Sequence, residues 1–283
     1  MKSYDLIIKN AQIHTMDEDR KVYAKGIIGI EGEKITLIKE MNELTPEEFQ
    51  KCEGAGRVID AEGKVVFPGF IDTHIHIFQS FLKGLGADHR LIEWLNLSAL
   101  PYGQYMTPHQ HELAAQLACM EAIKSGCTTM SEFFYTNQDS ELAHSCIEGM
   151  VSTGIRSVFI RTFQDTGEEY GMPKCFLEPV DKAMKEVDAL KKAYKENDML
   201  SIWTGPDVTW STTKEGYQEM LEYCLNENVR YSMHIKETEV DNEMCGRYYG
   251  KDIVDMLEEI GFLTDKFLAV HCVNLTPHDI ERF

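Results

Sequence analysis

Hydrophobic residues in the first quarter of the chain occur in short runs rich in isoleucine and valine, separated by polar stretches. Four of these runs have the composition of strands: residues 6–8, 27–30, 35–38 and 58–60. The glycine-bearing stretch between the second and third runs is typical of a β-hairpin turn. A polar stretch over residues 43–56 separates this hairpin from the last run. The pattern predicts a small β domain over residues 1–67.

From residue 68 onward, strand-like apolar runs alternate with segments in which apolar residues recur at helical spacing. The run over residues 65–76, interrupted by Pro68-Gly69, predicts a buried strand. Five further runs predict strands at residues 128–134, 156–163, 200–208, 229–235 and 267–273. A helix, or a connection long enough to hold one, separates each strand from the next.

The helices are indicated by capping residues and by apolar spacing. Thr107 begins a capping-box pattern, after which Leu113, Leu117 and Met120 recur at helical spacing. Thr212 has the same capping pattern ahead of a helix that precedes the fifth strand. Other helices are predicted over residues 142–150, 180–194 and 253–260.

Repeated strand–helix units predict a parallel sheet with right-handed crossovers. A closed (β/α)8 barrel requires eight such units, and only six strands are predicted here. Thr276 begins a further predicted helix, and the given chain ends about one turn later, at Phe283. We therefore interpret residues 68–283 as the first six βα units of a barrel, and the chain as the front portion of a longer protein. An open six-stranded sheet is the alternative. The long connection over residues 78–107, which contains Trp94, is interpreted as an active-site loop with a short helix.

Composition narrows the class of protein. The chain has 283 residues, 43% of them hydrophobic and 27% charged, which is ordinary for a soluble globular enzyme. Its net charge of −19 repels nucleic acid and anionic membranes, so neither is expected as a partner. The N-terminus lacks the apolar stretch of a signal peptide, and no run reaches the roughly 18 apolar residues of a membrane span. The eight cysteines form no Cys-x-x-Cys pair and are expected to be reduced. We expect a cytoplasmic protein.

Histidines at strand ends carry the candidate chemistry. His74 and His76 are two residues apart and therefore project to the same side of their strand. His234 and His271 fall at the carboxyl ends of the fifth and sixth predicted strands, the end of a barrel where catalytic residues collect. A single histidine on a strand is usually a core residue, but four at strand ends predict a metal site.

Three motifs together resemble the amidohydrolase superfamily. They are the run over residues 68–76, the pair His234-x-x-Glu237, and the run over residues 269–273. The fit is best to the deaminase and chlorohydrolase branch, which includes guanine, cytosine, methylthioadenosine/adenosylhomocysteine and triazine aminohydrolases. The resemblance covers nearly the whole chain. It implies an α/β fold, a TIM-like metal-dependent hydrolase barrel with its C-terminal units absent from this chain, together with the N-terminal part of a composite β-sandwich.

The resemblance also implies roles for residues. His74, His76 and His234 would bind one divalent metal ion, with zinc expected and iron the alternative. Glu237 would move protons between water and a ring nitrogen of the substrate, and His271 would contact the attacking hydroxide or the carbonyl-like centre. The family's remaining ligand is an aspartate after the eighth strand, which lies beyond this chain. The family also suggests a homo-oligomer.

Substrate determinants are expected around the same strand ends. Gln79 is placed to hydrogen-bond a heterocycle, and Trp94 either lines the pocket or anchors its loop. Nucleoside-acting members of the branch carry Pro-x-Glu after this tryptophan, whereas here residues 101–103 contain no acid. They also carry Gly-Pro-His where this chain has Asp207 after Gly-Pro. A carboxylate there favours a substrate with N–H donors or positive charge and argues against an adenosine-type nucleoside.

Glu132 and the six remaining histidines can be explained without a role in the site. Glu132, at the end of the second strand, is either a further acceptor in the pocket or a carboxylate outside it. The remaining histidines are expected to be surface or capping residues: His14, His89, His109, His111, His144 and His278.

The sequence thus predicts a metal-dependent hydrolytic deaminase that acts on a small molecule. The substrate class is an amino-substituted nitrogen heterocycle, such as a purine base, a pterin-like ring or a triazine, and the product is ammonia. One alternative is a chlorohydrolase or alkylaminohydrolase of the same branch. Another is a catalytically silent binding protein with the same fold.

Overall fold

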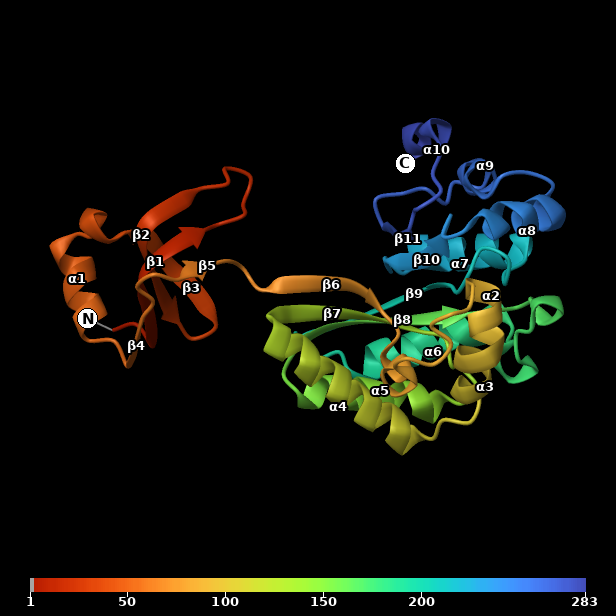
Figure 1. Cartoon of the computed structure of the whole chain (residues 1–283), viewed down its shortest axis with the longest axis horizontal. Coiled ribbons are helices and arrows are strands. Elements are labelled where there is room, and N and C mark those ends of the chain that lie inside the picture. The colour runs from red at the N-terminus through yellow and green to blue at the C-terminus, as the bar shows by residue number, and fades with distance from the viewer. Residues whose placement is uncertain (1–2) are drawn as a thin grey trace. The chain divides into compact units, whose positions relative to one another are not determined.

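The computed structural model describes residues 3–283, and the chain divides into two compact units, Met1–Gly69 and Phe70–Phe283 (Figure 1). The first unit is a five-stranded mixed sheet in the order β3-β2-β1-β4, with β5 also paired to β1. Its strands are β1 (Leu6–His14), β2 (Val22–Glu31), β3 (Lys34–Glu40), β4 (Arg57–Asp60) and β5 (Val65–Val66).

The predicted hairpin is confirmed, because β2 and β3 are antiparallel and Ile28 lies opposite Ile38. Alternate residues of the sheet are buried on opposite faces, so that Ile27 and Ile28 belong to different apolar clusters. The polar stretch contains a helix that was not predicted, α1 (Pro46–Glu53), which is held at its start by a capping box between Thr45 and Glu48.

The second unit contains six parallel strands that are neighbours in the order in which they occur along the chain (Figure 1). They are β6 (Phe70–Ile75), β7 (Cys127–Phe134), β8 (Arg156–Phe163), β9 (Leu200–Pro206), β10 (Tyr231–Ile235) and β11 (Phe267–His271). A sequential order of parallel strands means that every crossover turns the same way, which wraps the sheet into the arc of a βα barrel. All six predicted strands of this unit are present.

Helices connect these strands: α4 (Pro108–Ser125), α5 (Ser140–Ser152), α6 (Val180–Ala193), α7 (Lys214–Asn226), α8 (Glu239–Tyr249) and α9 (Ile253–Glu259). A further helix, α10 (Pro277–Arg282), follows β11. The capping box at Thr107 is confirmed. The predicted cap Thr212 is wrong by one residue, since the hydroxyl of Thr213 accepts from the Gly216 N–H. Helix α8 was not predicted.

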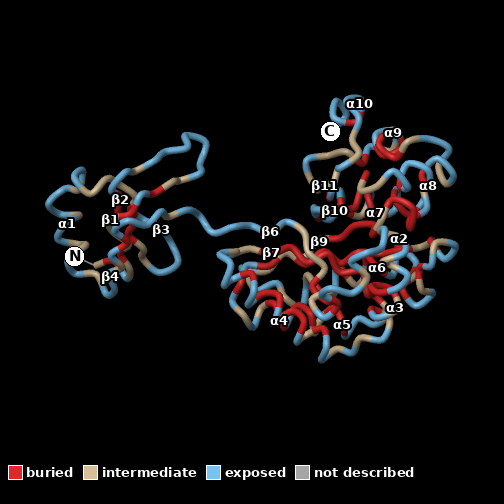
Figure 2. Tube along the Cα trace, viewed as in Figure 1, coloured by how far each residue is buried: buried red, intermediate tan, exposed pale blue. Residues whose placement is uncertain are grey.

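The buried face of α4 is not the one that the apolar pattern indicated. Leu113 and Met120 are 42% and 50% exposed, whereas the buried positions are occupied by small residues such as Ala115 and Cys119. Figure 2 shows α4 with both buried and exposed stretches along its length. The reason is the close approach of α5: a Cβ placed on Gly149 would lie 2.5 Å from the Glu112 carbonyl oxygen. A helix packed this closely buries alanine and leaves its larger side chains outside.

The expectation of one buried strand over residues 65–76 is wrong. Residues 65–66 form β5 in the first sheet, and β6 starts only at Phe70. Phe70 and Ile71 are 63% and 64% exposed, because β6 is an edge strand that pairs only with β7 among the described residues.

The long connection after β6 is more helical than predicted. It contains η2 (Ile77–Leu82), α2 (Leu91–Trp94), a π-helical turn η3 (Leu95–Ala99) and α3 (Leu100–Gly103). An apolar cluster holds it against the connection between β8 and α6, where two short turns lie, η4 (Glu168–Tyr170) and η5 (Lys174–Phe176). Within residues 3–283, no helix combines the length and apolarity needed to cross a membrane. The eight cysteines are all unpaired thiols.

Candidate metal centre and active site

Four histidine rings meet at the carboxyl ends of three strands. His74 lies in β6 and His76 follows it directly, while His234 lies in β10 and His271 ends β11. The ring centroids of His74 lie 4.7 Å from His76, 4.8 Å from His234 and 5.3 Å from His271. The structure therefore brings together the four histidines that the sequence placed at strand ends.

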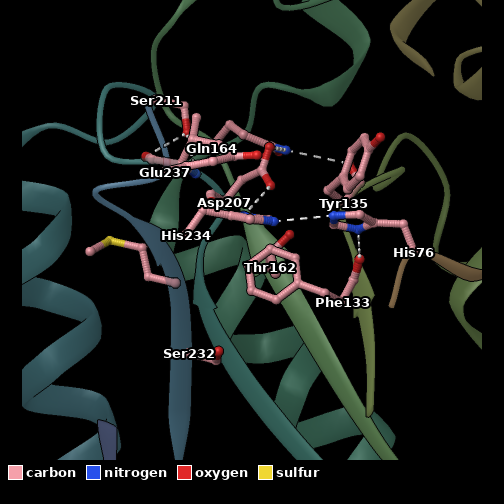
Figure 3. A network of polar contacts seen from close by, with 12 residues as sticks. His76, Phe133, Tyr135, Thr162, Gln164, Asp207, Ser211, Ser232, His234 and Glu237 are labelled. Carbon is pink, nitrogen blue, oxygen red and sulfur yellow. Dashed lines mark hydrogen bonds and ion pairs between the residues drawn. The ribbon is translucent and has the colours of Figure 1, made fainter. Parts of the chain in front are cut away.

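The hydrogen bonds of two rings fix which nitrogen carries the proton. His76 Nδ1 lies 2.9 Å from the Phe133 carbonyl oxygen, and His234 Nδ1 lies 2.6 Å from the Asp207 carbonyl oxygen (Figure 3). A carbonyl oxygen can only accept, so both Nδ1 atoms donate and both neutral rings present an Nε2 lone pair. These two Nε2 atoms face each other at 3.1 Å. Two lone pairs at this distance repel unless a cation lies between them.

The third ring, His74, adds an unsatisfied nitrogen to the same cluster of imidazoles. His74 Nδ1 is buried and has no hydrogen-bond partner among the described residues. One ring nitrogen from each of His74, His234 and His271 lies within 4.8 Å of the other two. Imidazole nitrogen is a preferred ligand of zinc and of iron. The donor set therefore fits a divalent metal ion.

Burial keeps these rings neutral. It acts together with the neighbouring His76 and His271 to lower the pKa of His74 to about 3. Burial likewise lowers the pKa of His76 to about 4 and that of His234 well below its usual value. A histidine binds a metal only when the coordinating nitrogen is unprotonated, so the buried setting prepares all three rings at neutral pH.

Glu237 is the carboxyl group beside these rings. Its Oε1 lies 3.5 Å from His271 Nε2. Burial, together with the negative charges of Asp241 and Asp207, raises the pKa of Glu237 to about 7. A carboxyl group with a pKa near 7 can both accept and donate a proton at physiological pH. Asp241 was not predicted, although Thr238-x-x-Asp241 has the spacing of the capping box that starts α8.

Asp207 is nearly enclosed, at 5% exposure, where β9 ends. Its Oδ2 accepts a hydrogen bond of 3.0 Å from Gln164 Nε2, which also lies 3.4 Å from the Tyr135 carbonyl oxygen (Figure 3). Burial raises the pKa of Asp207 to about 7. Gln164 and Tyr135 were not predicted, although each is the first residue after a strand and could have been found by that position.

A cavity of about 310 Å³ opens above the histidines. Gln79 lines it, and its Nε2 donates 2.9 Å to the Tyr135 hydroxyl. The sequence left two interpretations of Trp94 open, a pocket residue or an anchor of its loop. The structure is consistent with both, because Trp94 lines the cavity and its Nε1 donates a hydrogen bond to the Leu85 carbonyl oxygen. The other apolar residues of the wall are Leu91, Leu95, Leu100, Met172, Val208 and Trp210, along with Ile75.

Glu132 does not line this cavity. Side chains alternate along a strand, and the neighbouring Phe133 ring faces His234 at 4.3 Å. Glu132 therefore points toward the helices, where its Oε2 accepts a hydrogen bond of 2.6 Å from the Ile77 N–H. The interpretation of Glu132 as a pocket acceptor is wrong, and the alternative of a carboxyl group outside the pocket holds.

The buried Glu132 should make stability depend on pH. Burial raises its pKa to about 8, against about 4.3 in an unfolded chain. The stability that its proton contributes is fully present below about pH 4 and is lost as the pH rises to 8, at about 1.4 kcal/mol for each pH unit. Glu132→Gln lacks this loss, so at pH 7 its free energy of unfolding should exceed that of the wild type by about 4 kcal/mol.

Urea unfolding of both proteins at pH 5, 6 and 7 checks this expectation. The exposed Glu121→Gln is the matched control and should follow the wild type at every pH. Parallel curves for wild type and Glu132→Gln would contradict a protonated Glu132.

One histidine lies elsewhere than expected. The sequence predicted a surface or capping position for His111, but this residue is fully buried on α4, with Nε2 3.3 Å from the Thr136 hydroxyl. Burial lowers its pKa to about 4. The side chains of His109 and His278 are exposed, as expected.

Comparison with known proteins gives a consistent result. The model of the amidohydrolase family matches residues 65–283. The chain is similar to a 5'-deoxyadenosine deaminase of Methanococcoides burtonii, with 29% identity over 98% of this chain and 59% of that protein. It is also similar to a 5-methylthioadenosine/S-adenosylhomocysteine deaminase of Bacillus cytotoxicus, with 28% identity over 95% of this chain and 59% of that protein. The chain therefore spans about three fifths of these relatives.

Among solved structures, the chain resembles atrazine chlorohydrolase from Arthrobacter aurescens in complex with zinc. The TM-score is 0.85 at 22% identity, covering 98% of this chain and 63% of the other. This likeness supports the predicted TIM-like barrel fold.

Proposed function

The chain belongs to the amidohydrolase family, and from this premise we propose that it carries part of the active site of a metal-dependent deaminase. The reaction is the hydrolysis of an amino group from a nitrogen heterocycle, with release of ammonia. The observation that carries the proposal is the convergence of four imidazoles and Glu237 on one cavity. The named deaminase relatives support the same reaction class.

We assign His74, His76 and His234 as the ligands of one divalent metal ion, with zinc expected and iron the alternative. The facing Nε2 atoms and the unpartnered His74 Nδ1 support this assignment. When bound, such an ion supplies Lewis acidity and lowers the pKa of a water molecule toward about 7.

Glu237 is the proton carrier in this proposal. It takes a proton from the attacking water and delivers it to the ring nitrogen beside the reacting carbon, so that the ring gains no negative charge as the new C–O bond forms. His271 lies 3.5 Å from the Glu237 carboxylate and orients the attacking oxygen. The exocyclic amine then accepts the remaining proton of the attacking oxygen, the C–N bond breaks as the C=O bond forms, and the products are a ring carbonyl and ammonia.

The charges that line the cavity define the substrate class. Asp207, Glu237 and Asp241 contribute carboxyl groups, and no lysine or arginine of residues 3–283 lines it. Such a wall accepts hydrogen bonds, and it repels phosphate or carboxylate groups. We propose a neutral or cationic amino-heterocycle with N–H donors directed at Asp207, a hydrogen bond from Gln79, and packing against Trp94.

A screen of ammonia release from guanine, isoguanine, 8-oxoguanine, adenosine and melamine tests the function on the zinc-loaded, full-length protein. Release from an amino-rich base or triazine is expected. Strong activity on adenosine would overturn the substrate class, and binding without turnover would favour the silent binding protein. Chloride and alkylamine measured in the same reactions with substituted triazines separate the chlorohydrolase alternative. Homo-oligomerisation and cytoplasmic location remain predictions.

Asp207→Asn should lower kcat/KM about 10- to 100-fold for the best substrate, because a hydrogen bond to a charged acceptor contributes about 1.5–3 kcal/mol. Metal content should be unchanged, since the His234 ring donates its hydrogen bond of 2.6 Å to the backbone carbonyl oxygen of this residue, whereas the side-chain Oδ1 lies 3.7 Å from the same nitrogen. The control is an analogue whose N–H donor is methylated, for which wild type and variant should converge. An equal loss for both compounds would contradict a direct contact.

A further inference from the structure

Lys236 is a lysine with no exposed surface, and it lies between His234 and Glu237 in the sequence. Its Nζ lies 2.5 Å from Asp252 Oδ2 and 3.4 Å from Asp279 Oδ2. Lysine is almost never fully buried unless its charge is paired. The two carboxylates also cap helices: Asp252 accepts from the Val254 N–H at the start of α9, and Asp279 accepts from the Thr276 N–H at the start of α10.

The backbone at Lys236 has an uncommon conformation. Its φ is 54°, in the left-handed region that non-glycine residues rarely adopt without support from the surrounding structure. Directly after β10, this turn sends the Lys236 side chain to its two carboxylates while Glu237 lines the cavity. The turn is therefore the point at which the direction of Glu237 is decided.

Asn274 fixes the same turn from the segment that follows β11. Its backbone N–H donates a hydrogen bond of 2.9 Å to the Lys236 carbonyl oxygen, and its side-chain Nδ2 donates one of 3.1 Å to the Glu237 carbonyl oxygen. The Glu237 carboxylate itself has no hydrogen bond to the rest of residues 3–283, and the ring of His271 lies 3.5 Å from it. The place of this carboxylate is thus set by its backbone and not by its own side-chain contacts.

We propose that Lys236 is a positioning residue for Glu237: its buried ion pairs with Asp252 and Asp279 hold the left-handed turn that aims the Glu237 carboxylate into the cavity. The inference rests on the proposed function of Glu237. It assigns to α9 and α10 a contribution to catalysis through the ends that bind the lysine.

A double-mutant cycle on the zinc-loaded, full-length protein tests the proposal. Lys236→Met should lower kcat roughly 10- to 100-fold, because a displacement of about 1 Å of a catalytic group can have this effect. Metal content and KM should stay near wild type. If Lys236 acts through Glu237, adding Lys236→Met to Glu237→Gln should lower kcat no further. Equal losses in both backgrounds would show that Lys236 has a structural role only, and would overturn the proposal.

Two more variants keep the test decisive. Lys214→Met removes an exposed lysine that pairs with Glu259 of α9, and it should leave kcat unchanged. If Lys236→Met does not fold, Asn274→Ala removes the hydrogen bond to the Glu237 carbonyl and should lower kcat several-fold with the same non-additivity. A wild type without deaminase activity would reject the proposed function, whereas an active wild type with fully active Lys236 and Asn274 variants would reject this inference alone.

Discussion

His234→Asn should remove the metal from the protein and reduce ammonia release by at least roughly 10³-fold, because the lowering of a water pKa from about 15.7 to about 7 is lost with the ion. His234 is the most enclosed of the four rings, at 6% exposure, and its Nε2 is the atom that faces His76 Nε2. Asparagine at this position can still bond to the Asp207 carbonyl but cannot reach the shared point. Elemental analysis should give one metal ion per wild-type chain and almost none in the variant.

His109→Asn is the matched control, since this histidine is 74% exposed at its side chain on α4 and should keep full metal content and activity. His271→Asn separates two assignments of the remaining ring. If His271 orients the attacking oxygen, its variant should lose activity but keep the metal. If it is a ligand, as its nitrogen within 4.8 Å of those of His74 and His234 permits, the metal should be lost too. Full metal retention in His234→Asn would contradict the proposed centre.

The meeting of these histidines could be predicted because it depends only on strand geometry. The two histidines of a His-x-His pair in a strand point to the same face, because side chains alternate with a period of two residues. Parallel strands then bring their carboxyl ends to one edge of the sheet. The same reasoning would have shown that Glu132 and Phe133 point to opposite faces, once the direction of either was known. What the sequence lacked was the absolute direction of β7, because residues 130–134 are buried on both faces.

The errors on α4 have a different cause. Apolar spacing identified the helix but indicated the wrong face, because the neighbour α5 brings Gly149 into contact and selects alanine over leucine. Packing partners decide such a choice, and a single sequence does not contain them. His111 was misplaced for the same reason: it lies on the buried face of α4.

The sequence did not predict Gln164 and Tyr135, because their roles depend on the tertiary structure. Four neighbouring strands, β6 to β9, end side by side, which brings Gln164 to Asp207 and Tyr135 to Gln79. Nothing in the sequence assigned a role to Lys236, which lies inside the His234-x-x-Glu237 motif. Its burial depends on Asp252 and Asp279, which come 16 and more residues later in the chain.

Glu237→Gln should lower kcat by roughly 10²- to 10⁴-fold, the usual contribution of a positioned general acid–base group. Glutamine keeps the size of the side chain but can neither take a proton from water nor deliver one to the ring nitrogen. The metal content should remain that of the wild type, because Glu237 is 3.5 Å from His271 and is not assigned as a ligand. KM should change little, since the lost interaction acts mainly in the transition state.

A glutamate outside the cavity provides a chemically matched control for this variant. Glu239→Gln changes another glutamate two residues later, in the first turn of α8, which does not line the cavity and should behave as wild type. Glu237→Asp should recover only part of the activity, because the shorter side chain retains the carboxyl group but draws it back from the substrate. A Glu237→Gln protein that released ammonia at the wild-type rate would assign the proton transfer to another group. Of the remaining carboxyl groups that line the cavity, Asp207 is held by Gln164 and Asp241 by the cap of α8, so neither is as free to move between water and the ring.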